Sequence, residues 1–180
     1  MQESATKITA HLVNQKIAGI QFFNLNDSYF IFDPNSIWVF DTGIQLTLES
    51  GIFSFGWNSE FDGFDYSTEK TMDQLQTDET VYTIDPEETK ALEQLIGATI
   101  TDVSYEWDYY QDYDEFAQLK EEKIYVPVQI KLQLDNDHTL QLAALRYGIH
   151  PETKQIAKAN FDLQGQLFVS LNNVLEVEQA

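Results

Sequence analysis

Residues 44–57 read IQLTLESGIFSFGW, and apolar and polar side chains alternate on both sides of a polar turn at 49–51. Alternation with a period of two places every second side chain on the same face of an extended strand. The apolar set consists of Ile44, Leu46, Leu48, Phe53, Phe55 and Trp57. The segment therefore predicts an antiparallel hairpin with one buried face.

A second segment, residues 130–144 (IKLQLDNDHTLQLAA), repeats this pattern around a turn at 135–138. Apolar residues precede both segments at matching spacings: Leu12, Ile17, Ile20 and Phe22 before the first, and Leu95, Ile100, Val103 and Tyr105 before the second. Ile100 lies 83 positions after Ile17, and Ile130 lies 86 positions after Ile44. We expect a single compact domain, 1–180. The repeated pattern suggests that it consists of two similar halves, 1–70 and 81–180, with the junction between them at 67–80. The alternative is that any two amphipathic hairpins look alike.

Helical signals are few. Asp85-Pro86-Glu87-Glu88 is typical of a helix start, and the helix is expected to end at Gly97. Residues 4–13 indicate a weaker helix, and residues 110–120 an ambiguous one. Further strands are expected at 29–32, 37–40, 125–134, 166–171 and 174–177. The fold class is therefore α+β: mostly antiparallel β-sheet with few helices, and with room for two duplicated helix-plus-hairpin halves.

The composition excludes several classes of function. The chain has 180 residues, with 30 acidic and 10 basic side chains and a net charge of −20. Nonspecific nucleic-acid binding and binding to anionic membranes both need clustered Lys and Arg, so neither is expected. The absence of Cys excludes disulfides, thiolate metal sites and cysteine nucleophiles. Neither a signal peptide nor a membrane-spanning segment is apparent, so we expect a cytoplasmic protein.

The charge is concentrated in the central third of the chain. Residues 49–115 carry eighteen acids and two lysines, and their acids are interleaved with aromatic residues. Aromatic residues are favoured at the centres of protein interfaces, and carboxylates complement Lys and Arg on a partner. The candidate partner-binding residues are Trp57, Glu60, Asp62, Asp65, Tyr66, Glu106, Trp107, Asp108, Tyr109, Tyr110, Asp112, Tyr113, Asp114 and Glu115. The alternatives are a solvated face that serves solubility, or a sheet whose aromatic residues lie in the core.

This acidic and aromatic character resembles that of bacterial immunity proteins, which neutralise basic toxins by covering their active sites. The resemblance is one of size and composition, and no motif specific to an immunity family is present. It implies a non-enzymatic, inhibitor-like protein that covers a basic protein partner. A DNA mimic, whose carboxylates stand in for phosphates, is a close variant. The sequence leaves the oligomeric state open.

Residues 58–69 carry a second hypothesis, a calcium site. Asn58, Glu60, Asp62 and Glu69 fall at positions 1, 3, 5 and 12 of an EF-hand-type loop, and Gly63 falls at position 6. The pattern departs from the motif because Asn stands at the first position and Glu at the third. The segment before it also indicates a strand instead of a helix. Calcium binding is therefore the alternative function.

The common local motifs of enzymes are absent from the sequence, while a Ser/His/Asp triad, whose members need not be near in sequence, stays open. It contains no G-x-S-x-G elbow, no P-loop, no dinucleotide fingerprint and no close pair of histidines. For Arg146, the single arginine, the options are a buried ion-pair partner or an anion clamp, and a structural role is the more usual one. A hydrolase that uses two of the many carboxylates is the residual alternative, although no pair is singled out.

Overall fold

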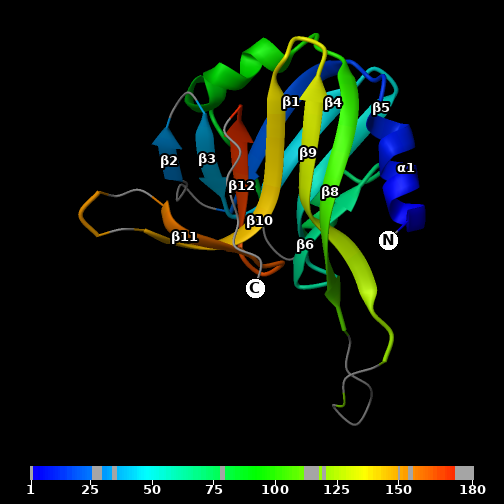
Figure 1. Cartoon of the computed structure of the whole chain (residues 1–180), viewed down its shortest axis with the longest axis vertical. Helices are drawn as coiled ribbons and strands as arrows, with labels where there is room; N and C mark the ends of the chain where they lie inside the picture. Colours follow the sequence, from blue (N-terminus) through cyan, green and yellow to red (C-terminus); the bar gives the residue numbers. More distant parts are fainter. Residues whose placement is uncertain are drawn as a thin grey trace.

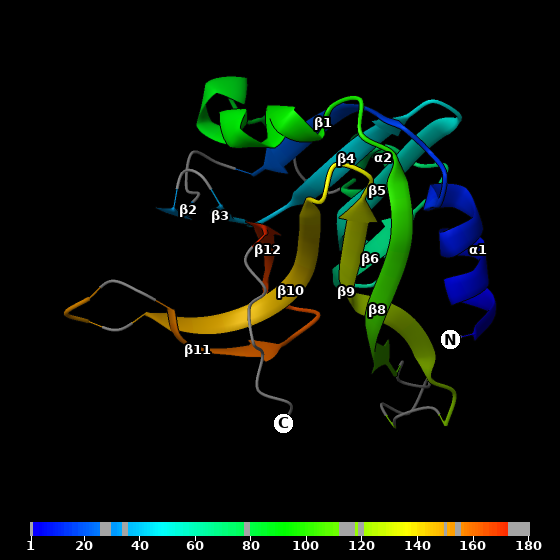
Figure 2. The same ribbon diagram turned by 45° about the horizontal axis from the view of Figure 1, so that its top comes forward.

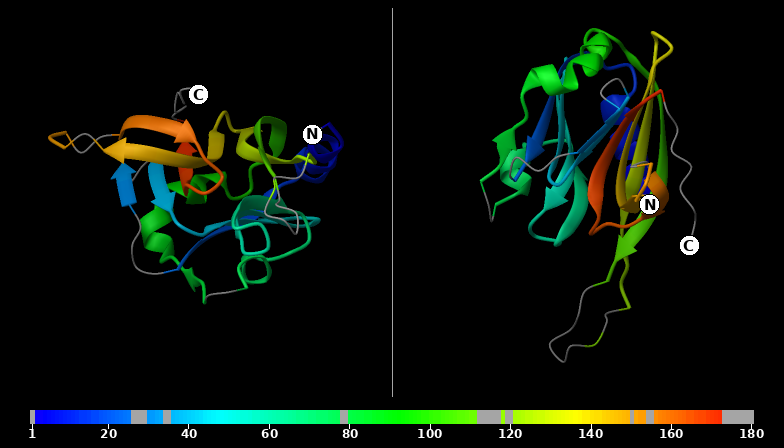
Figure 3. Two further views of the ribbon diagram at one scale, coloured as in Figure 1. Left: turned by 90° about the horizontal axis from the view of Figure 1, so that it is seen from below. Right: turned by 90° about the vertical axis from the view of Figure 1, so that its left-hand side faces the viewer.

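Two antiparallel sheets pack face to face in the computed structural model, which describes residues 2–25, 30–33, 36–77, 80–111, 118, 121–149, 151–153 and 156–172 (Figure 3). The first sheet has the strand order β6-β5-β4-β1-β7, and the second has β2-β3-β12-β10-β9-β8, with β11 also paired to β10. The strands are β1 (Ile17–Asn24), β2 (Phe30–Asp33), β3 (Ile37–Phe40), β4 (Gly43–Leu48), β5 (Gly51–Asn58), β6 (Gly63–Ser67), β7 (Tyr82–Thr83), β8 (Ile100–Tyr110), β9 (Ile124–Leu134), β10 (Thr139–Ile149), β11 (Ile156–Phe161) and β12 (Gln166–Leu171). The α+β prediction, dominated by antiparallel sheet, is confirmed.

Three helices lie within the described residues: α1 (Gln2–Leu12), α2 (Met72–Leu75) and the 3-10 helix η1 (Pro86–Leu95). Helix α1 closes one open side of the two-sheet sandwich beside β8 (Figure 2). None of these helices is long and apolar enough to cross a membrane. The predicted helix start at Asp85 is correct, since its carboxylate accepts a hydrogen bond from the Glu87 N–H (3.0 Å). The segment is a 3-10 helix interrupted at Thr89, whose backbone is not helical.

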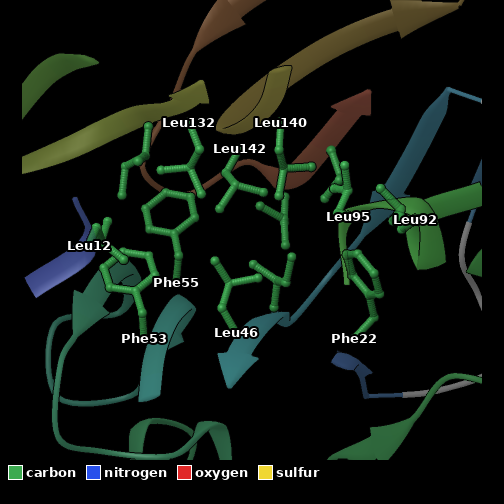
Figure 4. Packing of buried hydrophobic residues seen from close by; sticks show 14 of the residues in the cluster. Leu12, Phe22, Leu46, Phe53, Phe55, Leu92, Leu95, Leu132, Leu140 and Leu142 are labelled. Carbon is green, nitrogen blue, oxygen red and sulfur yellow. The ribbon is translucent and has the colours of Figure 1, made fainter. Parts of the chain in front are cut away.

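The core lies between the two sheets (Figure 4). Phe53 and Phe55 of β5 point from the first sheet toward Leu132 of β9 and Leu142 of β10 in the second. All four side chains are fully buried. The alternation in both predicted hairpins therefore marks the two inner faces, as expected when two sheets pack against each other.

The backbone repeats itself at the spacing seen in the sequence. The Ile17 N–H donates to the Ala98 carbonyl (2.9 Å), and 83 positions later the Ile100 N–H donates to the Gln15 carbonyl (2.9 Å). Each half thus bonds to the other with the same local geometry. The connections that lead into these strands also match, because Asn14 and Gly97, again 83 apart, both have a positive φ.

The strand pairing repeats as well. Ile17 is in register with Leu48 and Ile100 with Leu134, and both ladders are irregular directly afterwards. Each half also contributes strands to the other sheet, because β3 pairs with β12 and β7 pairs with β1. The two halves are therefore interlocked, and their duplication stays a prediction.

Other expected elements differ from the structure. The expected junction at 67–80 contains α2, whose Met72 and Leu75 are buried against the outer face of the first sheet. The expected helix at 110–120 begins on Tyr110, which is instead the last residue of β8. Its residues 112–117 and 119–120, and the expected strand at 174–177, lie outside the described residues.

Candidate functional site

The structure brings together two stretches of the acidic and aromatic block, residues 57–66 and 105–110, where β6 begins and β8 ends. The Tyr110 hydroxyl donates a hydrogen bond to the Phe64 carbonyl (2.8 Å). The Tyr110 ring stacks on Phe61, with centroids 5.9 Å apart and an interplanar angle of 16°. These contacts join segments that are 46 positions apart in the chain.

Local sequence explains how β6 can approach Tyr110 so closely. The Asn58 side-chain oxygen accepts a hydrogen bond from the Glu60 N–H (3.0 Å), and this contact shapes the β5–β6 turn. Gly63 then lies directly beneath the Tyr110 hydroxyl and near the Leu163 carbonyl. A side chain at position 63 would collide with both groups, so the glycine is required by this close approach.

The Tyr110 phenol lies among carboxylates. Burial raises its pKa first, and the charges of Asp65, Asp108, Asp62 and Asp162 raise it further. These four acids come from β6, β8, the β5–β6 turn and the β11–β12 turn. The fold thus gathers negative charge from distant parts of the chain around one aromatic ring.

Asp65 is partly buried, and its surroundings shift its pKa. Burial raises the pKa of its carboxyl group, while hydrogen bonds from the Tyr66 backbone and the Asn58 amide (3.2 Å) lower it in part. Lys70 lowers this pKa and Glu60 raises it, both at longer range. The environment therefore disfavours the charged form of Asp65.

A groove of about 380 Å³ opens beside Asp65. It lies between β6, the beginning of β9 and the beginning of α1. Figure 1 shows β8 and β9 extending together below the point where β6 begins. The lining includes Phe61, Asp65, Tyr66, Glu69, Ile124 and Tyr125. The groove therefore combines aromatic rings with carboxylates.

Large apolar side chains are exposed around this groove. Phe61 is 38% exposed, Tyr109 40%, Ile124 39% and Tyr125 37%. Tyr109 and Tyr125 are opposite each other on β8 and β9, with ring centroids 5.9 Å apart. Together with the acids they form what we name the acidic–aromatic surface: Glu60, Phe61, Asp62, Asp65, Tyr66, Glu69, Asp108, Tyr109, Tyr110, Ile124 and Tyr125.

Two lysines already contact this surface. The Lys123 ammonium lies 3.7 Å from the centroid of the Tyr109 ring, a cation–π contact. The Lys70 ammonium lies 3.7 Å from the Glu60 carboxylate, and both side chains are largely exposed. The surface is thus able to hold cations on both its rings and its carboxylates.

The candidate residues of the sequence fall into four groups. Glu60, Asp62, Glu106 and Tyr109 are exposed. Four aromatic residues are partly buried and pack against the main core: Trp57, Tyr66, Trp107 and Tyr110. For these residues the alternative interpretation, a sheet whose aromatic residues lie in the core, describes their position. Asp65 and Asp108 are partly buried. Asp112, Tyr113, Asp114 and Glu115 lie outside the described residues.

The sequence did not single out Phe61, Ile124 and Tyr125. Phe61 lies among the candidate residues between Trp57 and Tyr66, and its position in a turn between two strands was the available signal. Ile124 and Tyr125 reach the surface because they pair with Tyr110 and Tyr109. That register depends on the connection between β8 and β9, and side-chain alternation alone does not predict it.

The calcium hypothesis finds little geometric support. Residues 58–63 form a tight connection in which Asn58 pairs with Gly63, and Glu69 lies beyond the end of β6. The Asn58 side chain is buried and already bonded to Glu60 and Asp65. Within the described part of the chain, which includes all of 58–69, no three His, Asp or Glu side chains are grouped as metal ligands would be.

Arg146 differs from its expected burial. It forms an ion pair with Asp162 (2.9 Å), but its side chain is 72% exposed. The pair is thus a surface contact of small energetic weight.

Comparison with known proteins adds no identity to these observations. Neither the models of protein families, nor the curated proteins, nor the solved structures include a match to this chain.

Proposed function

We propose that this chain is a non-enzymatic binding protein that covers a basic protein partner with its acidic–aromatic surface, as an immunity protein or inhibitor does. The observation that carries the proposal is the meeting of the two segments at Tyr110. It brings Phe61 and the β5–β6 turn, with its exposed acids, against Tyr110 and beside a groove flanked by exposed aromatic residues.

The physical argument rests on the combination of rings and charges. Complementary charge accelerates association, whereas buried aromatic contacts slow dissociation. A surface that served solubility alone would gain nothing from four exposed large apolar side chains in one place. An acidic protein with such a surface is therefore suited to a partner rich in Lys and Arg.

The test is affinity capture with a matched pair of variants. The chain is immobilised and exposed to lysate of its native cells, and bound protein is eluted with rising salt. One variant carries Asp62→Asn, Asp65→Asn and Glu69→Gln on the acidic–aromatic surface. The control carries Glu87→Gln, Glu88→Gln and Glu93→Gln on η1, and so loses the same charge from exposed positions elsewhere.

The proposal expects a basic protein that the parent and the η1 variant retain and the surface variant releases. Elution should occur as salt rises, because added salt shortens the screening length from about 8 Å at physiological ionic strength and so weakens exposed charge pairs. A protein retained equally by both variants, or an empty column, would overturn the proposal.

A further inference from the structure

The groove beside Asp65 has the composition of a site for one cationic side chain. Phe61, Tyr66 and Tyr125 supply aromatic surface, and Asp65 and Glu69 supply carboxylates. We propose that this groove receives an arginine side chain of the basic partner. This inference rests on the proposed function, which it extends to the chemistry of the contact.

The surface itself shows how a cation is held there. Lys123 lies over the Tyr109 ring at the edge of β8 and β9, within the same group of aromatic residues. An incoming cation meets the same kind of ring at Tyr125, which lies directly opposite Tyr109. The contact is therefore one that this part of the fold already makes with its own lysine.

Arginine fits the groove better than lysine does. Its guanidinium group is planar, so it stacks on tyrosine rings while its N–H groups bond to carboxylates. It is also more weakly hydrated than an ammonium group, and its removal from water into a partly enclosed groove costs less. Lys70 also lines the groove and pairs with Glu60. Asp65 keeps its hydrogen bonds from Asn58 and the Tyr66 backbone, so Glu69 is the exposed carboxylate that meets the guanidinium group first.

A side chain is the expected occupant because the edge of β6 is already bonded. The Phe64 N–H donates to the Leu163 carbonyl (2.7 Å), and the Phe64 carbonyl accepts from Tyr110. The Tyr66 backbone bonds to the Asp65 carboxylate. A partner strand would have to displace these contacts before it could add to the sheet. Contact through a side chain leaves them in place.

The experiment measures binding of a small probe by the isotope-labelled chain. N-acetyl-arginine methylamide is titrated into the protein at about 0.15 M salt, which is the physiological ionic strength. The chemical shifts of the protein are followed by NMR. The lysine analogue and the uncharged citrulline analogue are titrated in the same way. The spectrum of each variant also reports directly whether it is folded.

Two matched pairs of variants locate the probe. Glu69→Gln lies at the groove and Glu93→Gln on η1, and both residues are exposed. Tyr125→Ala lies at the groove, whereas Tyr82→Ala lies on β7, at the opposite edge of the first sheet from β6.

We expect each groove variant to weaken binding of the arginine probe about fivefold, as is usual for partly exposed cation–π and charge contacts. The two control variants should bind as the parent does, the lysine probe should bind more weakly, and the citrulline probe should not bind. Equal binding by all variants, or equal binding of the arginine and lysine probes, would overturn the inference. If the probe fails while capture of a basic protein still depends on the surface, the inference falls and the proposed function stands.

Discussion

Tyr110 connects the two sheets through one hydroxyl group and one ring. Its hydroxyl donates to the carbonyl of Phe64, on the edge strand of the first sheet, while its own strand belongs to the second. Gly63 leaves the space for this approach. The acidic–aromatic surface therefore depends on a small number of atoms at its centre.

Tyr110→Phe tests this connection. The variant keeps the stack on Phe61 but removes the hydrogen bond, so we expect a loss of about 1 kcal/mol in the free energy of unfolding. Tyr109→Phe, at an exposed neighbouring position, is the control and should change stability by less than about 0.5 kcal/mol. Both changes in the free energy of unfolding are to be measured by urea denaturation. Equal effects for the two variants would show that the bond to Phe64 contributes nothing.

Asp65 makes stability depend on pH in a defined direction. Because its pKa is raised above the ordinary value of 3.8, the folded protein holds this proton more tightly than the unfolded chain does. Ionised Asp65 therefore lowers the stability of the folded state at neutral pH. The penalty disappears as the pH falls through the raised pKa to below the ordinary value.

Asp65→Asn should accordingly raise the melting temperature at neutral pH, and the gain should shrink as the pH is lowered toward 3.8. The measurement is thermal unfolding followed by circular dichroism across this range. Asp62→Asn, in the exposed turn, removes a charge from the same surface without changing an enclosed carboxyl. If the melting temperature rose equally in both variants at every pH, the cause would be weaker repulsion among the surface carboxylates and not the burial of Asp65.

At the level of elements, side-chain alternation predicted the strands that face the core. The expected boundaries at 37–40 and 166–171 agree with β3 and β12. Alternation reports which face of a strand is buried, whereas the choice of neighbouring strand depends on contacts across the whole chain. The sequence therefore could not place β3 beside β12, nor bring Ile124 and Tyr125 to the site.

The helices show the same limit. Asp85 and Pro86 marked the start of η1 because capping is local chemistry. Helix α2 escaped prediction because its four residues are too few to show helical periodicity. It exists through burial of Met72 and Leu75, which is a tertiary effect.

The repeated connections at Asn14 and Gly97 give a prediction about backbone strain. Gly97 has φ of 88° and open space around it, so Gly97→Ala should cost about 1–2 kcal/mol through the left-handed conformation alone. Asn14, with φ of 66°, tolerates this conformation, and Asn14→Gly should change stability by less than about 0.5 kcal/mol. Both are measured by chemical denaturation. A neutral Gly97→Ala variant would contradict the role assigned to this glycine.

At the scale of the whole molecule, the two sheets share one core, and each sheet contains strands from both halves of the chain. Leu46 in the first sheet and Leu132 in the second are both fully buried. Leu46→Ala and Leu132→Ala should each cost about 2–5 kcal/mol and shift a single unfolding transition.

Tryptophan fluorescence and far-ultraviolet circular dichroism, recorded on the same samples, test for a single transition. Trp57 lies in the first sheet, and Trp38 and Trp107 lie in the second. The fluorescence therefore reports on the unfolding of both sheets. Transitions that separate between the two signals in either variant would mean that the sheets unfold independently.

The pairing of β3 with β12 also has a consequence for folding while the chain is being synthesised on the ribosome. Val39 pairs with Phe168, so β3 waits for a neighbour that is made about 130 residues later, on the order of ten seconds at typical rates of synthesis. During this interval Trp38 and Phe40, which the finished protein buries completely, have no finished sheet to join. The nascent chain therefore keeps these apolar side chains out of their final packing until synthesis is almost complete.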